Sequence, residues 1–183
     1  TVSEAYEVKN IMVDDESSEI GLKFVNTGTI DRYLCLWGAK PTRYIKEAYK
    51  FPRVPISGLS PRRQRQSTSK KIIIAGMTKV LEAFFDQSGE YIAGKSTLII
   101  PVETDQEGWG LLALLNSRVI TEWYNIEFSS LSLAGGYLRI NKSCINQIPL
   151  PPHFDEYCRI IAPTSALMAK EVSEGGSAAR IEE

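Results

Sequence analysis

The chain has 183 residues, of which 43% are hydrophobic and 9% aromatic, and its formal net charge is −1. This length fits about one domain with an appended helix, and the apolar fraction supports a core, which excludes wholesale disorder. No apolar run approaches the roughly 18 residues that cross a bilayer and no signal peptide opens the chain, so we expect no membrane partner. The three cysteines are far apart and odd in number, which favours a reduced, cytoplasmic location over a disulfide framework. A first residue other than methionine suggests a piece of a longer protein.

The basic residues concentrate in one segment. Residues 32–79 hold twelve bases against a single acid, Glu47, a local balance of +11, and the chain on both sides is acidic. Such a block produces a one-sided positive field, which is typical of a protein that binds a polyanion. A solvated basic surface without a ligand is the alternative interpretation.

The first half of the chain favours short strands and loops. We expect strands, of which the first is weak, at 4–13, 20–28 and 32–38. Pro52 and Pro55 limit any helix in 42–49 to one or two turns. Residues 56–71 are predicted to form a polar loop, because their arginine and glutamine side chains have no apolar neighbours.

The second half combines apolar strands with helices. We expect a buried strand at 71–76, a strand or short helix at 79–86, and a strand pair or one long bent strand at 91–101. The clearest helix is expected at 104–125, because the pattern of Thr104 and Glu107 predicts a capping box and apolar residues recur at helical spacing. A second helix is expected at 154–175, broken or restarted at Pro163.

Between these helices lies the stretch "GGYLRINKSCINQIPLPP", residues 135–152. Its paired glycines can take backbone angles closed to other residues, a short half-buried strand follows, and three prolines end the regular structure. The expected fold is α+β, with small mixed β-sheets packed with a few helices. The expected parts are a domain at 1–152, a C-terminal helical segment at 153–175 and a flexible tail at 176–183.

A phosphate-loop pattern is present in residues 89–96, "GEYIAGKS". In that motif a helix begins at the lysine, so that backbone amides and the helix dipole meet the phosphates. Here a β-branched run follows Lys95 and Pro101 closes it, which leaves no room for a helix. A nucleotide-binding protein that uses Gly89–Ser96 is therefore only a remote alternative, from a different class of function. This alternative predicts that Lys95→Ala abolishes nucleotide binding.

The sequence offers little to a metal or a catalytic centre. His153 is the single histidine, the cysteines have no C-x-x-C spacing, and no G-x-S-x-G elbow supplies a nucleophile. Neither an N-P-P-Y run nor a glycine-rich methyl-donor loop is present. We therefore expect no catalytic residue, no metal and no cofactor in this chain.

Binding to nucleic acid remains the favoured interpretation. Lysines and arginines neutralise phosphates, and arginine and glutamine make paired hydrogen bonds to guanine and adenine edges. The predicted base-reading residues are Arg62, Arg63, Gln64, Arg65 and Gln66. The predicted phosphate contacts are Arg43, Lys46, Lys70, Lys71, Lys79, Arg139 and Lys142.

The order of parts resembles a known family. "LKFVNTGTIDRYLCLWG", the strand region 70–101, "LLALLNSRVITEWYN" and above all "GGYLRINKSCINQIPLP" are similar to the TaqI-like C-terminal target-recognition domain. That domain occurs in adenine-specific DNA methyltransferases and in type IIG restriction-modification enzymes, and the resemblance covers about 24–151. The continuation "LPPHFDEYCRII" also resembles type I specificity subunits, so half of such a subunit is a further alternative.

The resemblance implies a target-recognition architecture and double-stranded DNA as the partner. It also implies that a methyltransferase domain of the same polypeptide binds S-adenosylmethionine and methylates adenine, while this chain only reads the target. Individual base contacts vary among family members and are not carried over.

Overall fold

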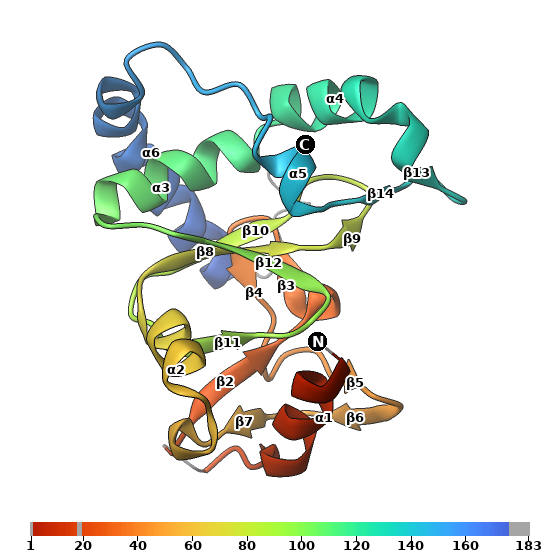
Figure 1. Cartoon of the computed structure of the whole chain (residues 1–183). Helices are drawn as coiled ribbons and strands as arrows, with labels where there is room; N and C mark the ends of the chain where they lie inside the picture. The colour runs from red at the N-terminus through yellow and green to blue at the C-terminus, as the bar shows by residue number, and fades with distance from the viewer. Residues whose placement is uncertain (1, 18–19, 176–183) are drawn as a thin grey trace.

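The computed structural model of the chain describes residues 2–17 and 20–175, so the predicted tail at 176–183 lies outside the described residues. Small sheets and helices of different sizes make up the described part, and the α+β prediction is confirmed. In Figure 1 a four-stranded sheet with two short helices forms the lower half, and a three-stranded sheet covered by longer helices forms the upper half. None of the described helices combines the length and the apolar character needed to span a membrane.

The four-stranded sheet holds the first core. Its strands, in spatial order, are β1 (Val13–Asp14), β7 (Pro52–Val54), β2 (Leu22–Val25) and β11 (Tyr91–Ala93). β11 runs parallel to β2, and the other pairs are antiparallel. Phe24, Val54 and Ile92 are fully buried in this core. The strand expected at 20–28 is confirmed by β2.

Two helices flank this sheet where the sequence predicted none. α1 (Val2–Ile11) replaces the weak strand, because Val8 and Ile11 pack together against the core around Phe24. α2 (Pro61–Thr68) replaces the polar loop. Ser60 caps α2 by accepting a hydrogen bond from the Arg63 amide at 3.4 Å, and Pro61 occupies the first helical position, which suits proline.

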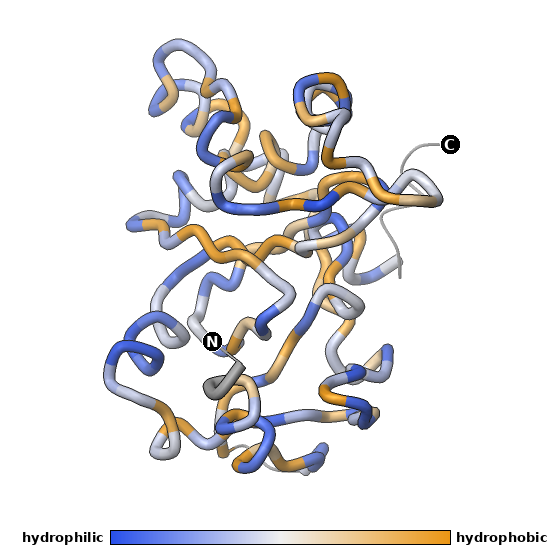
Figure 2. Tube along the Cα trace, turned by 45° about the vertical axis from the view of Figure 1, so that its right-hand side comes forward, coloured by the Kyte–Doolittle hydropathy of each residue, from blue (hydrophilic) through white to orange (hydrophobic). Residues whose placement is uncertain are grey.

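The central strand of the second sheet is buried on both faces. The strand order of this sheet is β10 (Ala83–Asp86), β8 (Lys71–Ala75) and β12 (Thr97–Pro101), all antiparallel. Along β8, Ile72 and Ile74 face one hydrophobic cluster and Ile73 and Ala75 face another. This explains the continuous apolar run of the strand, which Figure 2 shows in orange. The strand predictions at 71–76 and within 79–86 are confirmed. Residues 91–101 form two strands, β11 and β12, which belong to different sheets.

The predicted helix at 104–125 is two helices, α3 (Asp105–Leu115) and α4 (Arg118–Glu127). Asn116 causes the break, because its side-chain amide donates to the Ala83 carbonyl at 2.9 Å and its oxygen accepts from the Ala83 amide at 3.0 Å. Ser117 then caps α4 by accepting from the Ile120 amide at 3.2 Å.

The C-terminal helix α6 (Phe154–Gly175) is continuous, so the predicted break at Pro163 is wrong. Pro163 lies on the exposed side of α6, where water can satisfy the carbonyl that loses its partner. α6 packs along α3 at very short range. A Cβ on Gly110 would come within 2.4 Å of the Cys158 sulfur, so only glycine allows this approach.

The remaining elements are short. They are the 3-10 turns η1 (Thr27–Thr29), η2 (Ile56–Gly58) and η3 (Ser129–Leu131), the hairpins β3–β4 (Ile30–Asp31, Leu34–Cys35) and β5–β6 (Thr42–Tyr44, Glu47–Tyr49), the sheet β13–β14–β9 (Ser132–Leu133, Tyr137–Arg139, Met77–Thr78), and helix α5 (Lys142–Ile145). The segment 42–49 is therefore a hairpin rather than helical turns, and Ile45 and Lys46 at its tip have positive φ. The expected strand at 32–38 shrinks to β4. Gly135 and Gly136 have φ of 80° and 77°, as the glycine pair predicted.

Candidate nucleic-acid interface

A groove runs between α2 and α5, with strand β12 along its floor. It encloses about 470 Å³. Its polar lining, which we call the basic groove, consists of Arg63, Gln66, Lys95, Thr97, Lys142 and Asn146. Leu98, Ile99 and Ile100 supply the apolar floor. The lining therefore offers three cations, two amides and no carboxylate.

The absence of carboxylates follows from the sequence in a specific way. The acid-free stretches of the chain include 48–81, 91–102 and 128–154. α2 belongs to the first stretch, β12 to the second and α5 to the third. Because the fold brings these stretches together, the groove keeps a positive field in a chain whose net charge is only −1.

The five predicted base-reading residues all lie on α2, and the helix distributes them over different sides. Arg63 and Gln66, three residues apart, line the basic groove. Arg62 and Arg65 are exposed outside the groove. Gln64 turns to the protein, where its amide donates to the carbonyls of Ile56 at 3.0 Å and Leu59 at 2.8 Å; these bonds leave it poorly placed to read a base.

Arg63 has a structural role as well, because its guanidinium donates to the Ala93 carbonyl at the end of β11. This bond ties α2 to the sheet that forms the edge of the groove. The guanidinium is thus held in one orientation, which is the arrangement that a recognition residue needs.

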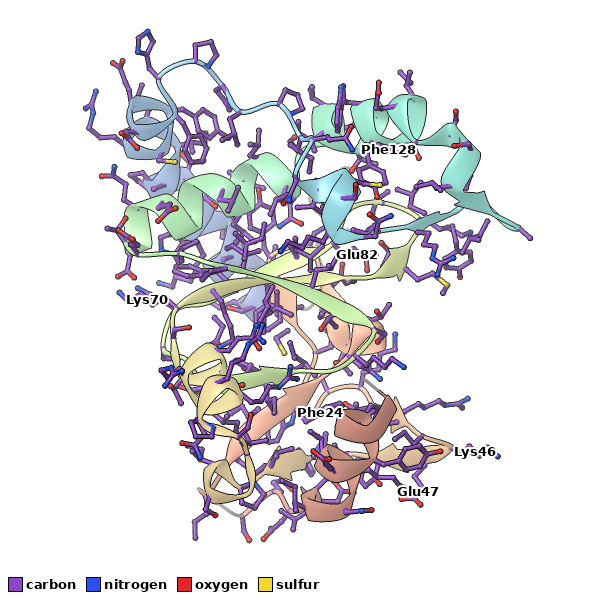
Figure 3. All side chains as sticks on the ribbon, in the orientation of Figure 1. Phe24, Lys46, Glu47, Lys70, Glu82 and Phe128 are labelled. Carbon is purple, nitrogen blue, oxygen red and sulfur yellow. The ribbon has the colours of Figure 1, made fainter. Side chains whose placement is uncertain are left out.

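The predicted phosphate contacts lie in several places. Lys142 lines the basic groove, and Arg139 is exposed on the neighbouring strand β14. Arg43 and Lys46 belong to the β5–β6 hairpin, and Figure 3 shows Lys46 projecting at the right-hand edge, with α2 at the left. Lys70 forms an ion pair with Asp105 at 2.5 Å. The fold therefore gathers only part of this set beside the groove.

Lys71 is a correction, because it is 1% exposed and cannot reach a phosphate. Its ammonium pairs with the Asp86 carboxylate and donates to the carbonyls of Ser67 at 2.5 Å and Ser69 at 3.1 Å. Burial lowers the pKa of Lys71, and the Asp86 charge opposes this effect. Its place at the start of a continuous apolar run, which is typical of a strand buried on both faces, could have indicated an inward position.

The sequence missed Lys95, Thr97 and Asn146 as lining residues. Lys95 was assigned to the phosphate-loop pattern, but no helix begins there: β11 precedes it and β12 follows it. The Gly94 amide donates to the Val25 carbonyl at 2.7 Å and is not free to cradle a phosphate. The signal that could have found Lys95 is its position in an acid-free stretch.

No catalytic constellation emerges from the part of the chain that the structure describes. Within residues 2–17 and 20–175, no group of three His, Cys, Asp or Glu side chains could hold a metal ion. Burial raises the pKa of the Cys35 thiol to about 11, which keeps it protonated and unreactive at neutral pH. His153 lies at the entry to α6, where its carbonyl accepts from the Glu156 and Tyr157 amides.

The cationic lining of this groove suits a polyanion. The model of the TaqI-like C-terminal specificity domain matches residues 23–150, and the chain belongs to this family. The family identifies the polyanion as DNA, because its members recognise DNA targets in restriction-modification enzymes. A specificity domain is itself non-catalytic. No curated protein matches the chain.

Proposed function

We propose that the basic groove holds duplex DNA and that α2 reads base edges from the major groove. The observation that supports this most is the lining of the groove, which has three cations, two amides and no carboxylate. Such a lining suits a polyanion, because lysine and arginine neutralise phosphates and arginine and amide side chains bond base edges. A short helix fits the major groove, which is about 12 Å wide.

The residues divide into two roles. Arg63 and Gln66, on the groove side of α2, are the proposed base readers, because arginine pairs with guanine and glutamine with adenine through two hydrogen bonds each. Lys95, in the turn before β12, and Lys142, at the start of α5, are the proposed phosphate contacts. Arg62 and Arg65 remain candidates for the adjacent strand.

We further propose that the parent enzyme methylates adenine in DNA at the target that this chain selects, as part of a type IIG restriction-modification system in bacterial defence. The resemblance of "GGYLRINKSCINQIPLP" supports this finer assignment. A methyltransferase domain of the same polypeptide supplies S-adenosylmethionine and the pocket for the extruded adenine. The role of this chain is to hold the duplex in register while the base is flipped.

Two alternatives have less support. The nucleotide-binding alternative requires a helix that begins at Lys95, whereas β12 begins at Thr97. Half of a type I specificity subunit would need a long spacer helix, whereas α6 packs along α3. Lys95→Ala still separates the first alternative from DNA recognition. It weakens duplex DNA binding under our proposal, and it abolishes nucleotide binding under the alternative.

Fluorescence anisotropy tests the proposal with a labelled pool of duplexes that share fixed ends and a randomised centre. Binding should weaken steeply between about 50 and 200 mM salt, because each neutralised phosphate adds about one released counterion. Lys95→Gln and Lys142→Gln should each lower the salt slope by about one. The matched control is Lys170→Gln, since Lys170 is exposed on α6, where its ammonium lies 3.9 Å from the Glu174 carboxylate. Absence of binding at about 50 mM salt, or an affinity that is constant up to about 200 mM, contradicts the proposal.

A further inference from the structure

We propose that the outer face of the sheet β13–β14–β9 is a second DNA-contacting surface, and that the β13–β14 hairpin enters a groove of the same duplex. This inference rests on the proposed function, because it assumes that duplex DNA lies in the basic groove. It adds apolar and aromatic contacts, which the cationic groove does not supply.

The two faces of this small sheet differ sharply. Directly opposed residues point to the same face, so the buried pair Leu138 and Thr78 marks the inner side. Tyr137 and Arg139 are the neighbours of Leu138 along β14, so they point to the opposite, outer face. Their cross-strand partners, Leu133 and Met77, point to the same outer face. Met77 is 51% exposed, Tyr137 41% and Leu133 38%. Three large apolar side chains therefore share one solvent-facing surface, a feature that marks an interaction site.

The charges around this surface select a polyanion as its occupant. The Lys79 ammonium lies 5.7 Å from the centre of the Tyr137 ring, and Arg139 is exposed beside Met77. Neither cation forms an ion pair with an acid in residues 2–17 or 20–175. β9 belongs to the acid-free stretch 48–81, and β13 and β14 belong to 128–154. A protein partner would need carboxylates to match this surface, whereas DNA supplies phosphates beside apolar base faces and thymine methyl groups.

The shape of the hairpin suits entry into a DNA groove. In Figure 1, β13 and β14 extend to the right-hand edge, away from the central sheet. The tip consists of Ala134, Gly135 and Gly136, and a Cβ added at Gly136 would meet nothing within 4 Å. The tip is therefore narrow and exposed, and the major groove admits a two-stranded β-ribbon of this kind.

The root of the hairpin is fixed and adjoins the basic groove. The Tyr124 hydroxyl donates to the Arg139 carbonyl at 3.0 Å, and the Ile140 amide donates to the Gly76 carbonyl at 3.0 Å. β14 leads within three residues to Lys142, which lines the basic groove. A duplex in the groove thus passes near a rigid hairpin, which is the requirement for a precise contact.

Anisotropy with the full chain and the randomised duplex pool tests the inference through two kinds of variant. Lys79→Gln and Arg139→Gln should each lower the salt slope by about one. The double variant Leu133→Ser/Tyr137→Ser should weaken binding about fivefold or more at every salt concentration without changing the slope, as loss of an apolar groove contact does. Ile160→Ser on α6, which removes an exposed apolar side chain of similar size, should have no effect.

A second measurement does not depend on affinity. A benzophenone amino acid in place of Tyr137 should crosslink to DNA on irradiation, and the same group in place of Ile160 should not. If wild-type protein binds and Lys142→Gln weakens binding, but the hairpin variants bind normally and position 137 gives no crosslink, the hairpin inference is wrong and the proposed function stands. If wild-type protein binds no duplex, both are wrong.

Discussion

Replacement of Lys71 by methionine should destabilise the fold while leaving any DNA contact untouched. Lys71→Met removes the ammonium but keeps a side chain of similar length at the start of β8. The Asp86 carboxylate then stays buried, at 0% exposure, without its cation. The carbonyls of Ser67 and Ser69 lose the donor that now satisfies them.

The magnitude follows from these contacts. Removal of one partner from a buried ion pair costs about 3–5 kcal/mol, because an uncompensated charge stays in the core. Asp86 keeps two donors, the amides of Glu90 and Tyr91 at 3.0 Å each, which places the expected loss near the lower end of this range. The exposed pair of Lys70 with Asp105 provides the control: Lys70→Met should cost less than about 1 kcal/mol, because its side chain is 41% exposed.

Urea denaturation followed by circular dichroism measures both variants against wild-type protein. We expect a lower midpoint with an unchanged m-value for Lys71→Met, and a small shift for Lys70→Met. Two outcomes would refute the reasoning. One is a loss below about 1 kcal/mol for Lys71→Met, which would mean that the pair is hydrated. The other is a lower salt slope for DNA binding by folded Lys71→Met protein, which would make Lys71 a phosphate contact after all.

Burial raises the pKa of Glu82 from its ordinary 4.5 to about 7. Between these two pH values the folded state binds more protons than the unfolded state. The free energy of unfolding therefore falls as pH rises through this range. After allowance for solvent screening, this fall in the free energy of unfolding is about 1–2 kcal/mol. Urea denaturation at pH 5 and pH 8 should show that Glu82→Gln protein lacks the fall. A variant whose stability falls between these pH values as much as that of wild-type protein contradicts this prediction. Asn116→Ala leaves the Ala83 amide and carbonyl without partners and should cost about 2–4 kcal/mol, whereas a thermal midpoint equal to that of wild-type protein would show that water replaces the bonds. Gly110→Ala drives a methyl group against Cys158 and should lower the free energy of unfolding by about 1–3 kcal/mol, measured by the thermal midpoint. The DNA affinity should not change, because neither residue lines the basic groove. An unaltered stability would mean that α6 does not pack on α3 as described.

Patterns that depend on neighbours in sequence predicted the fold well. The apolar run of β8 and the glycine pair before β14 express local constraints, namely burial on both faces and positive φ. The two missed helices have different causes. α1 is helical because one side of it packs on the first core, a tertiary contact that the sequence does not show. α2 begins at Ser60 and Pro61, a local helix-start pattern that the loop prediction overlooked.

The cationic character of the candidate site could be predicted from the sequence, but the identity of its lining residues could not. A block of bases indicated a polyanion, and the fold places only part of that block at the groove. Lys71 counted among the bases and is buried, whereas Lys95 and Asn146 lie far from the block and line the groove. Membership depends on how β12 and α5 are placed against α2, and residue spacing contains no information on that placement.

Selection from a randomised duplex library, followed by sequencing of the bound fraction, tests the central claim most directly. The account predicts that the chain enriches one short sequence, and that Arg63→Lys and Gln66→Ala change the enriched bases, because both side chains lie in the basic groove. Arg63→Lys keeps a charge that can reach the Ala93 carbonyl while losing the bidentate fork. A bound fraction without sequence preference at any salt concentration, or a preference that both variants leave unchanged, would contradict the claim that α2 reads the DNA target.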